Sequence, residues 1–294
     1  MVWDKIKELL GNNKSQVIKR FSGNENKKVK KRLQNNLNYI KNVLVQSDDL
    51  ISRKFYIGGD SNTEAEIVYF SSMVEAEYLQ REILKPLMLE INLNEQNFCI
   101  KEQLNNIITN YSVPLVEVKL STSIDECIES ILAGNGVLFI NNYKVAYILD
   151  IRSWSGRTVE NPHIEATTRG PQEAFNESLA TNISLVRKRL RDNNLMIKKN
   201  KIGTRVKTDV ALCYIDDIVD KSLVKEIKER INNLSVDGIL DIGQLNQYIE
   251  ESWLSIFPQF QSTERPDKVV ANLLEGRIIL MLDGSPFVSI VPTN

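Results

Sequence analysis

Two arginines stand directly before predicted helices, and they offer the clearest binding chemistry in the chain. Arg169 lies before a Gly-Pro pair, and Arg265 lies before Pro266. A guanidinium beside the free N–H groups of a helix N-terminus can bind a carboxylate or another anion. An ion pair between one of these arginines and Glu173 is the alternative. The arginines therefore predict either a carboxylate or subunit contact between two lobes, or an internal ion pair.

The segment around Arg265 reads as a helix cap. Thr263 or Glu264 can precede the helix, Pro266 suits its first turn, and Asp267 complements the helix dipole. Capping does not need Arg265, which makes it a binding candidate. The candidate ligand or subunit contacts are Arg169, Glu173, Glu177, Asn182, Thr263, Glu264, Arg265 and Asp267.

A central helix is predicted from Pro171 to Leu190, with Gly170 as its N-cap. Its apolar stripe consists of Phe175, Leu179, Ile183, Val186 and Leu190. Asn182 falls within that stripe, where an unpaired amide would cost about 1–3 kcal/mol. We expect Asn182 to bond a nearby backbone group and so fix how the helix docks.

Catalytic chemistry finds no support in the sequence. The chain lacks a P-loop, a Gly-x-Gly-x-x-Gly turn after a strand and a Gly-x-Ser-x-Gly elbow. Its one histidine, His163, has no companions at metal-ligand spacing. Cys99, Cys127 and Cys213 are far apart in apolar surroundings, which is typical of reduced core residues. We predict a protein that is not an enzyme and holds no cofactor or metal.

Composition indicates an ordinary globular chain of about two domains. Of 294 residues, 42% are hydrophobic and 26% charged, and 37 basic against 38 acidic residues leave a formal charge of −1. That balance argues against nucleic acid as a partner. The sequence has no apolar run of about 18 residues and no secretory signal at its start, so we expect no membrane span within it.

The order of predicted elements repeats along the chain. In each half a helix is followed by a hairpin, two helices, a further helix and a second hairpin. The Ser-Thr pairs at 121 and 262 are 141 residues apart, and Gly134 and Gly276, which end the later helices, are 142 apart. We predict an α/β fold of α+β-like mixed sheets, with two lobes that each pack helices on a small mixed sheet. An internal duplication would explain the repeat, and two unrelated α/β lobes are the alternative.

This organisation gives four predicted segments. Residues 1–26 form an amphipathic head and a flexible tether, and residues 27–152 form an N-terminal α/β lobe. Residues 153–168 connect the lobes, and residues 169–294 form a C-terminal α/β lobe. Lys27 to Arg32 is a basic cluster at the start of the first lobe, and we expect it to face solvent rather than an acidic partner.

Several motifs in the second half occur together in one known family. They are Glu160-Asn161-Pro162, Arg169-Gly170-Pro171 with Glu173, Phe175, Glu177, Leu179, Asn182 and Arg187-Lys188-Arg189, Gly203-Thr204-Arg205, Phe257-Pro258-Gln259, Thr263-Glu264-Arg265-Pro266-Asp267, Leu274-Glu275-Gly276-Arg277 and Asp283-Gly284-Ser285-Pro286-Phe287. In these the chain resembles the A subunit of GerA-type spore germinant receptors. Gln172 and Ala174 depart from the usual Arg-Gly-Pro-Arg-Glu-Gly pattern, and residues 1–120 match only in general character.

The resemblance implies the soluble N-terminal region of a membrane protein in the inner membrane of the endospore, with this region in the spore core. Its implied partners are the B and C subunits of the receptor, with self-association of the A subunit as a further candidate. The implied function is a signalling and assembly domain that passes nutrient recognition to a membrane complex, which triggers ion release and germination. The alternative is a domain that binds a nutrient, such as an amino acid or sugar, in the cleft between the lobes.

Overall fold

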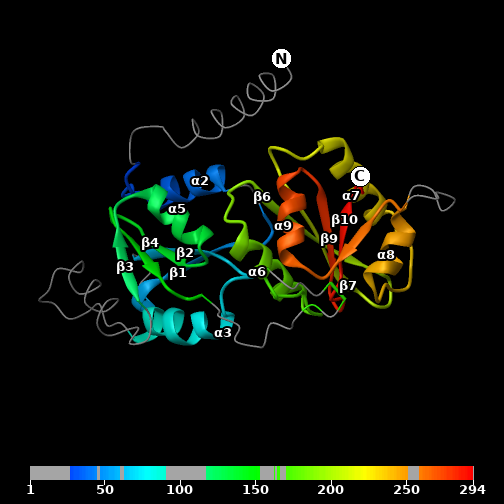
Figure 1. Cartoon of the computed structure of the whole chain (residues 1–294). Coiled ribbons are helices and arrows are strands. Elements are labelled where there is room, and N and C mark those ends of the chain that lie inside the picture. The colour runs from blue at the N-terminus through cyan, green and yellow to red at the C-terminus, as the bar shows by residue number, and fades with distance from the viewer. Residues whose placement is uncertain are drawn as a thin grey trace, which may run out of the picture.

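The computed structural model shows two lobes side by side (Figure 1). It describes residues 27–44, 47–59, 63–90, 117–152, 162, 164–165, 170–250 and 258–293. The predicted head and tether at 1–26 lie outside the described residues, as does most of the predicted connection at 153–168.

The first lobe is built on a five-stranded sheet. Its strands are β1 (Leu50–Tyr56), β2 (Glu64–Phe70), β3 (Val118–Ser121), β4 (Gly136–Ile140) and β5 (Ala146–Leu149). They lie in the order β1-β2-β4-β5-β3, and every pairing is antiparallel.

The second lobe repeats this sheet. Its strands are β6 (Leu195–Ile202), β7 (Thr208–Ile215), β8 (Gln261–Thr263), β9 (Ile278–Leu282) and β10 (Val288–Val291). Their order, β6-β7-β9-β10-β8, is the order of the first sheet strand for strand, and again every pairing is antiparallel. The two-lobed α/β fold is thus confirmed, with antiparallel rather than mixed sheets.

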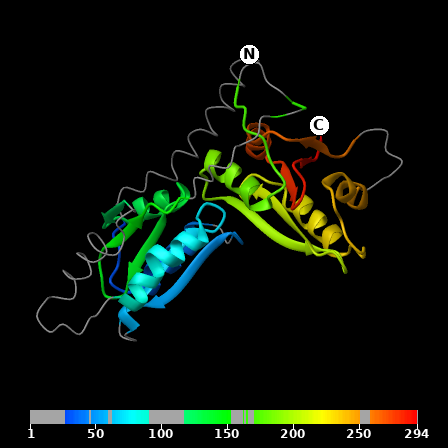
Figure 2. The same ribbon diagram turned by 90° about the horizontal axis from the view of Figure 1, so that it is seen from below.

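Helices cover both faces of each sheet. In the first lobe α2 (Leu33–Val43) and α5 (Ile124–Leu132) pack on one face. The other face carries a helical segment made of α3 (Ala76–Tyr78), η2 (Leu79–Leu84) and η3 (Pro86–Glu90), drawn in cyan in Figure 2, while η1 (Ile57–Gly59) follows β1. In the second lobe α6 (Leu179–Arg189) and α9 (Pro266–Leu274) take one face, and α7 (Lys221–Asn232) and α8 (Ile242–Ile249) take the other.

The central strands explain this three-layer arrangement. In β7, Val210, Leu212 and Tyr214 pack with α7 and α8, whereas Ala211, Cys213 and Ile215 pack with α6 and α9. Side chains alternate between the two faces of a strand, so a strand that is apolar at every position needs cover on both sides.

The two glycines predicted to end helices do so. Gly134 follows α5 with a φ of 97°, and Gly276 follows α9 with a φ of 84°. This left-handed conformation lets the chain leave a helix, and glycine adopts it without a Cβ clash.

The central helix of the structure, α6, begins later than the predicted start at Pro171. It begins at Leu179, with Ser178 as the N-cap that accepts a bond from the Thr181 N–H, while residues 171–176 are not helical. The Phe175 N–H donates to the Glu264 carbonyl at 2.8 Å, so this stretch bonds the neighbouring loop and does not form a helix. The apolar spacing from Cys99 to Ile108 also predicts a helix, and that segment lies outside the described residues.

Candidate functional site at the junction of the lobes

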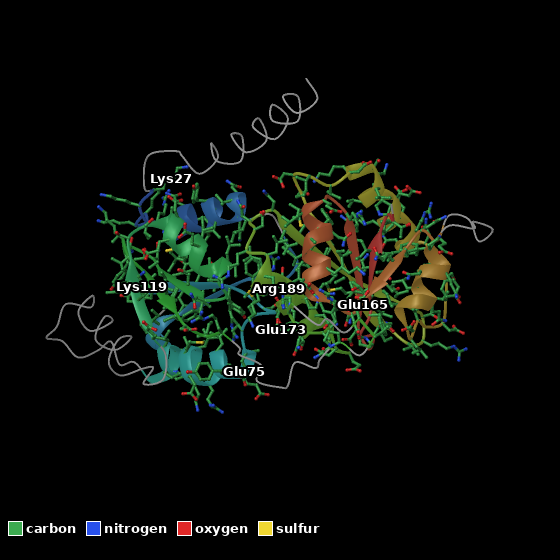
Figure 3. All side chains as sticks on the ribbon, in the orientation of Figure 1. Lys27, Glu75, Lys119, Glu165, Glu173 and Arg189 are labelled. Atoms are coloured by element: carbon green, nitrogen blue, oxygen red, sulfur yellow. The ribbon has the colours of Figure 1, made fainter. Side chains whose placement is uncertain are left out.

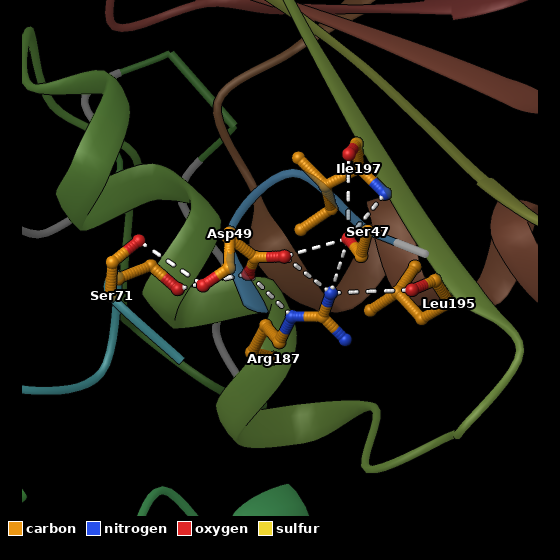
Figure 4. A network of polar contacts seen from close by, with 7 residues as sticks. Ser47, Asp49, Ser71, Arg187, Leu195 and Ile197 are labelled. Carbon is orange, nitrogen blue, oxygen red and sulfur yellow. Dashed lines mark hydrogen bonds and ion pairs between the residues drawn. The ribbon is translucent and has the colours of Figure 1, made fainter. Parts of the chain in front are cut away.

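A buried ion pair joins the two lobes. Arg187, near the end of α6, donates from Nε to Asp49 Oδ2 and from Nη2 to Asp49 Oδ1, both at 2.8 Å (Figure 4). Asp49 belongs to the loop between α2 and β1, so the pair spans the boundary between lobes. Arg187 is 2% exposed and Asp49 is fully buried. This two-pronged geometry is the strongest that arginine and carboxylate form.

Ser47 extends the pair to the edge of the second sheet. Its Oγ accepts from Arg187 Nη2 at 2.9 Å and donates to Asp49 Oδ1 at 2.6 Å. The same oxygen accepts from the Ile197 N–H at 2.9 Å, and the Asp48 N–H donates to the Ile197 carbonyl at 2.9 Å. The loop of the first lobe therefore pairs with β6, the edge strand of the second.

The end of β2 in the first lobe and the residues after it add further contacts to this network. The Arg187 guanidinium lies over the Phe70 ring, 4.0 Å from its centroid. The Ser71 N–H donates to the Asp49 carbonyl at 2.8 Å, and Ser72 Oγ donates to Asp49 Oδ2 at 3.2 Å. An arginine favours such a stacked and bonded position because its planar cation is weakly hydrated.

The surroundings of Asp49 keep it ionised. Burial acts to raise the pKa of this carboxyl, but the positive charge of Arg187 and the hydrogen bonds from Arg187 and Ser47 outweigh burial. The pKa of Asp49 is consequently lowered from its ordinary value. The network is therefore a true ion pair at neutral pH.

A hollow opens beside this network. It has a volume of about 350 Å³ and is lined by residues of both lobes, among them Lys41, Asp48, Ser52 and Lys198. Lys198 Nζ lies 2.8 Å from Asp48 Oδ1, so the wall itself contains a second contact between lobes. The hollow has the size of a site for a small polar molecule.

The structure describes only part of the predicted arginine site. Arg265 pairs with Asp267, two residues along, with Nη2 2.5 Å from Oδ2, and Arg169 lies outside the described residues. Glu173 instead binds Arg189, with Oε2 2.5 Å from Nη2, and the two are labelled together in Figure 3. Arg265 does not line the hollow beside the Arg187–Asp49 pair.

Thr263 and Glu264 hold part of the connecting segment. Glu264 is 5% exposed, and its Oε1 accepts from the backbone N–H groups of Ile164 at 2.6 Å and Glu165 at 2.7 Å. Thr263 Oγ1 donates to Glu165 Oε2 at 2.5 Å, and Lys268 Nζ lies 2.8 Å from Glu165 Oε1. Residues 164–165, which lie within the predicted connection at 153–168, are therefore anchored to the second lobe.

Asn182 bonds the backbone as expected. Its Oδ1 accepts from the Asn176 N–H at 2.9 Å, and its Nδ2 donates to the Asn176 carbonyl at 2.6 Å. Asn182 is fully buried, whereas the side chain of Glu177 is exposed. Asn36 does the same in the first lobe, where it bonds the N–H and the carbonyl of Lys30. The predicted docking role of Asn182 agrees with these contacts.

Sequence reasoning missed the junction residues themselves. Arg187 lies four positions after Ile183, hence on the apolar stripe of α6, and that placement was an available signal. Asp49 and Ser47 carry no such signal, because a polar loop between a helix and a strand is ordinarily solvated.

Two other kinds of site can be assessed within the described part of the chain. There, no cluster of three or more His, Cys, Asp or Glu side chains could hold a metal ion. Cys127 and Cys213 are buried free thiols, and burial raises the pKa of each to about 12. No helix among the same residues is long and apolar enough to cross a membrane.

Comparison with known proteins identifies relatives for almost the whole chain. Residues 38–294 match the family model described as Bacillus/Clostridium GerA spore germination protein. The chain is 34% identical over 257 residues to spore germination protein KA of Bacillus subtilis, covering 87% of this chain and 46% of the relative. It is 36% identical over 273 residues to the uncharacterized membrane protein YfkQ of the same organism, covering 93% and 52%.

A solved structure agrees with these matches. The chain is similar to the N-terminal domain of the A subunit of the Bacillus megaterium spore germinant receptor GerK3 in its crystal structure. The TM-score is 0.65 and the identity 32%, with 91% of this chain and 97% of the other covered. The chain spans about half the length of the curated relatives it matches.

Proposed function

The chain belongs to the GerA family of spore germination proteins, and we propose that its two lobes act as one signalling and assembly unit of a germinant receptor A subunit. In this role the unit is not an enzyme. It passes nutrient recognition to a membrane complex in the inner membrane of the endospore, which then releases ions and starts germination. Its partners would be the B and C subunits of that receptor, together with other copies of the A subunit.

The buried Arg187–Asp49 pair is the observation that supports this proposal. The pair and Ser47 connect α6 and β6 of one lobe to the α2–β1 loop of the other. A buried pair holds only one geometry, because any displacement leaves a charge without its partner. A force on one lobe is thus transmitted to the other instead of being absorbed between them.

Replacement of this pair in the full-length receptor tests the proposal. We expect Asp49→Ala to slow or abolish nutrient-induced loss of optical density in spores, with receptor abundance checked by immunoblot. Arg187→Met combined with Asp49→Ala removes both charges and should recover part of the response. Lys225→Ala, which removes an exposed contact with Glu229 on α7, is the control. Normal germination by Asp49→Ala spores at normal abundance would refute the coupling role.

Nutrient binding by this region is the second candidate, and the hollow beside the junction favours it. Its volume of about 350 Å³ lies within the range of about 300–1,000 Å³ typical of ligand sites. Lys41 and Lys198 could meet the carboxylate of an amino acid, and Ser52 could bond a hydroxyl of a sugar.

Calorimetric titration of this chain with amino acids and sugars tests the second candidate. We expect specific binding at millimolar concentration or tighter if the hollow is the nutrient site. Lys41→Ala should then weaken binding, while Lys207→Ala, an exposed lysine of the second lobe, should not. Absence of heat with every nutrient that triggers the receptor, or binding indifferent to Lys41→Ala, would remove this hollow from consideration.

A further inference from the structure

A run of exposed cations begins the described part of the first lobe. Lys27, Lys28, Lys30, Lys31 and Arg32 are all exposed, and Val29 between them is 4% exposed. We call residues 27–32 the basic surface. Its five charges are local, since the chain as a whole carries a formal charge of −1.

These cations differ from most others in the described residues. Elsewhere basic side chains usually meet an acid, as in the pairs Lys54–Glu64 and Arg230–Glu226. Within the described part of the chain, no side chain of the basic surface forms an ion pair with a carboxylate. Lys27 Nζ instead donates to the Tyr39 hydroxyl at 3.3 Å. The Asp125 carboxylate adjoins the surface, where its Oδ2 accepts from the Lys27 N–H at 3.3 Å, and the five cations outnumber it. The potential of the surface therefore stays positive.

The backbone of the basic surface is firmly held. The Val29 N–H donates to the Thr122 carbonyl at 2.8 Å, and the Ile124 N–H donates to the Lys27 carbonyl at 2.8 Å. Asn36 bonds both backbone groups of Lys30. The backbone therefore keeps the five side chains within one short segment of the surface. Such a cluster attracts anions, and closely spaced cations suit a broad anionic surface.

A hollow lies within this surface. Its volume is about 670 Å³, and Lys27, Lys28 and Lys30 line it together with Tyr39 and Ile124. A lipid headgroup could enter this space while the outer cations contact its neighbours.

The surface faces the same way as the end of the second lobe. Figure 3 places Lys27 at the upper side of the molecule, and Figure 1, in the same orientation, shows the chain leaving β10 toward that side. Under the function proposed above, the rest of a receptor subunit would extend into a membrane. If it follows β10, the bilayer lies on the side of the basic surface.

We propose that the basic surface at residues 27–32 docks this domain on the anionic lipid headgroups of the membrane that carries the receptor. This inference rests on the proposed function for the presence of that membrane. Four of the five cations are lysines, whose compact charges suit a diffuse anionic surface better than a single shaped partner. An acidic protein or a nucleic acid is the competing occupant, and the test below distinguishes them.

Vesicle sedimentation tests the proposal with the 294-residue chain. We expect binding to vesicles of phosphatidylcholine with phosphatidylglycerol, little binding to phosphatidylcholine alone, and release as salt rises. A basic residue near an anionic surface contributes about fivefold to binding. Lys28→Glu, Lys30→Glu and Lys31→Glu together should therefore weaken binding at least about a hundredfold. The matched control reverses three exposed cations elsewhere, Arg53→Glu, Arg191→Glu and Lys207→Glu, and should keep most of the binding.

Three results would overturn the proposal. They are equal binding to neutral vesicles, wild-type binding by the Lys28, Lys30 and Lys31 variant, and binding to duplex DNA or a polyglutamate peptide without binding to anionic vesicles. Unchanged circular dichroism spectra and melting temperatures would show that both triple variants are folded. Because the signalling role is tested through Asp49 in spores, a chain that ignores vesicles but needs Asp49 for germination would refute only the membrane contact.

Discussion

Removal of Asp49 should destabilise the chain strongly, because it leaves the Arg187 guanidinium buried without a counter-charge. Arg187 is 2% exposed, and its Nε and Nη2 both donate to Asp49. Breaking a buried pair by removing one partner costs about 3–5 kcal/mol. Since a domain is typically stable by about 5–15 kcal/mol, Asp49→Ala should remove a large fraction of the free energy of unfolding.

The double variant, Arg187→Met with Asp49→Ala, distinguishes the energy of the ion pair from the packing of its side chains. Arg187→Met should cost about as much as Asp49→Ala, because it strands a carboxylate that is fully buried. The combination strands neither charge, so its cost should fall about 1–3 kcal/mol below the sum of the single costs. Urea denaturation followed by circular dichroism measures all four proteins. Additive costs, or single costs below about 1 kcal/mol, would refute the claim that this pair fixes the junction.

The loss of stability at low pH gives a second measure of the Arg187–Asp49 pair. The pKa of Asp49 is lower in the folded chain than its ordinary value, so the folded state favours the ionised form. The stabilisation is therefore fully present above the ordinary value, about 3.9, and is lost as pH falls toward the folded value. We expect the wild type to lose stability more steeply than Asp49→Ala below about pH 4. Parallel pH profiles would contradict this reasoning.

Three further outcomes follow from other contacts. Asn182→Leu should lower the free energy of unfolding by about 1–3 kcal/mol in urea denaturation, because two backbone groups of Asn176 lose their buried amide partner, and Asn36→Leu should act alike on Lys30 in the first lobe. If either variant has the same free energy of unfolding as the wild type, the stabilising role of that asparagine is contradicted. Glu264→Ala should free the amides of residues 164–165, so their hydrogen exchange should rise while that of β7 does not. Cys213 should resist iodoacetamide at neutral pH until urea is added, because burial raises its pKa to about 12.

The repeat could be predicted from sequence because apolar periodicity and glycine placement carry it. The helix that ends before Gly276 lies where the pattern places it. The start of α6 could not be predicted in the same way. Residues 171–176 read as a helix by local rules, but the Phe175 N–H bonds the distant Glu264 carbonyl and the Asn176 N–H bonds Asn182 Oδ1, so this stretch is not helical. Tertiary contacts override helix propensity where a distant residue supplies the hydrogen bond to the backbone.

The two lobes diverge at the position that joins them. Helices α2 and α6 both have eleven residues, and both carry a buried asparagine at the fourth position, Asn36 and Asn182. At the ninth position the first has Lys41, which is exposed, and the second has Arg187, which is buried against Asp49. Lysine cannot replace arginine here, because one ammonium cannot bond both carboxylate oxygens and Ser47 while stacking on a ring. The scaffold common to both lobes accounts for their fold, and the departure from it at Arg187 accounts for their attachment to each other.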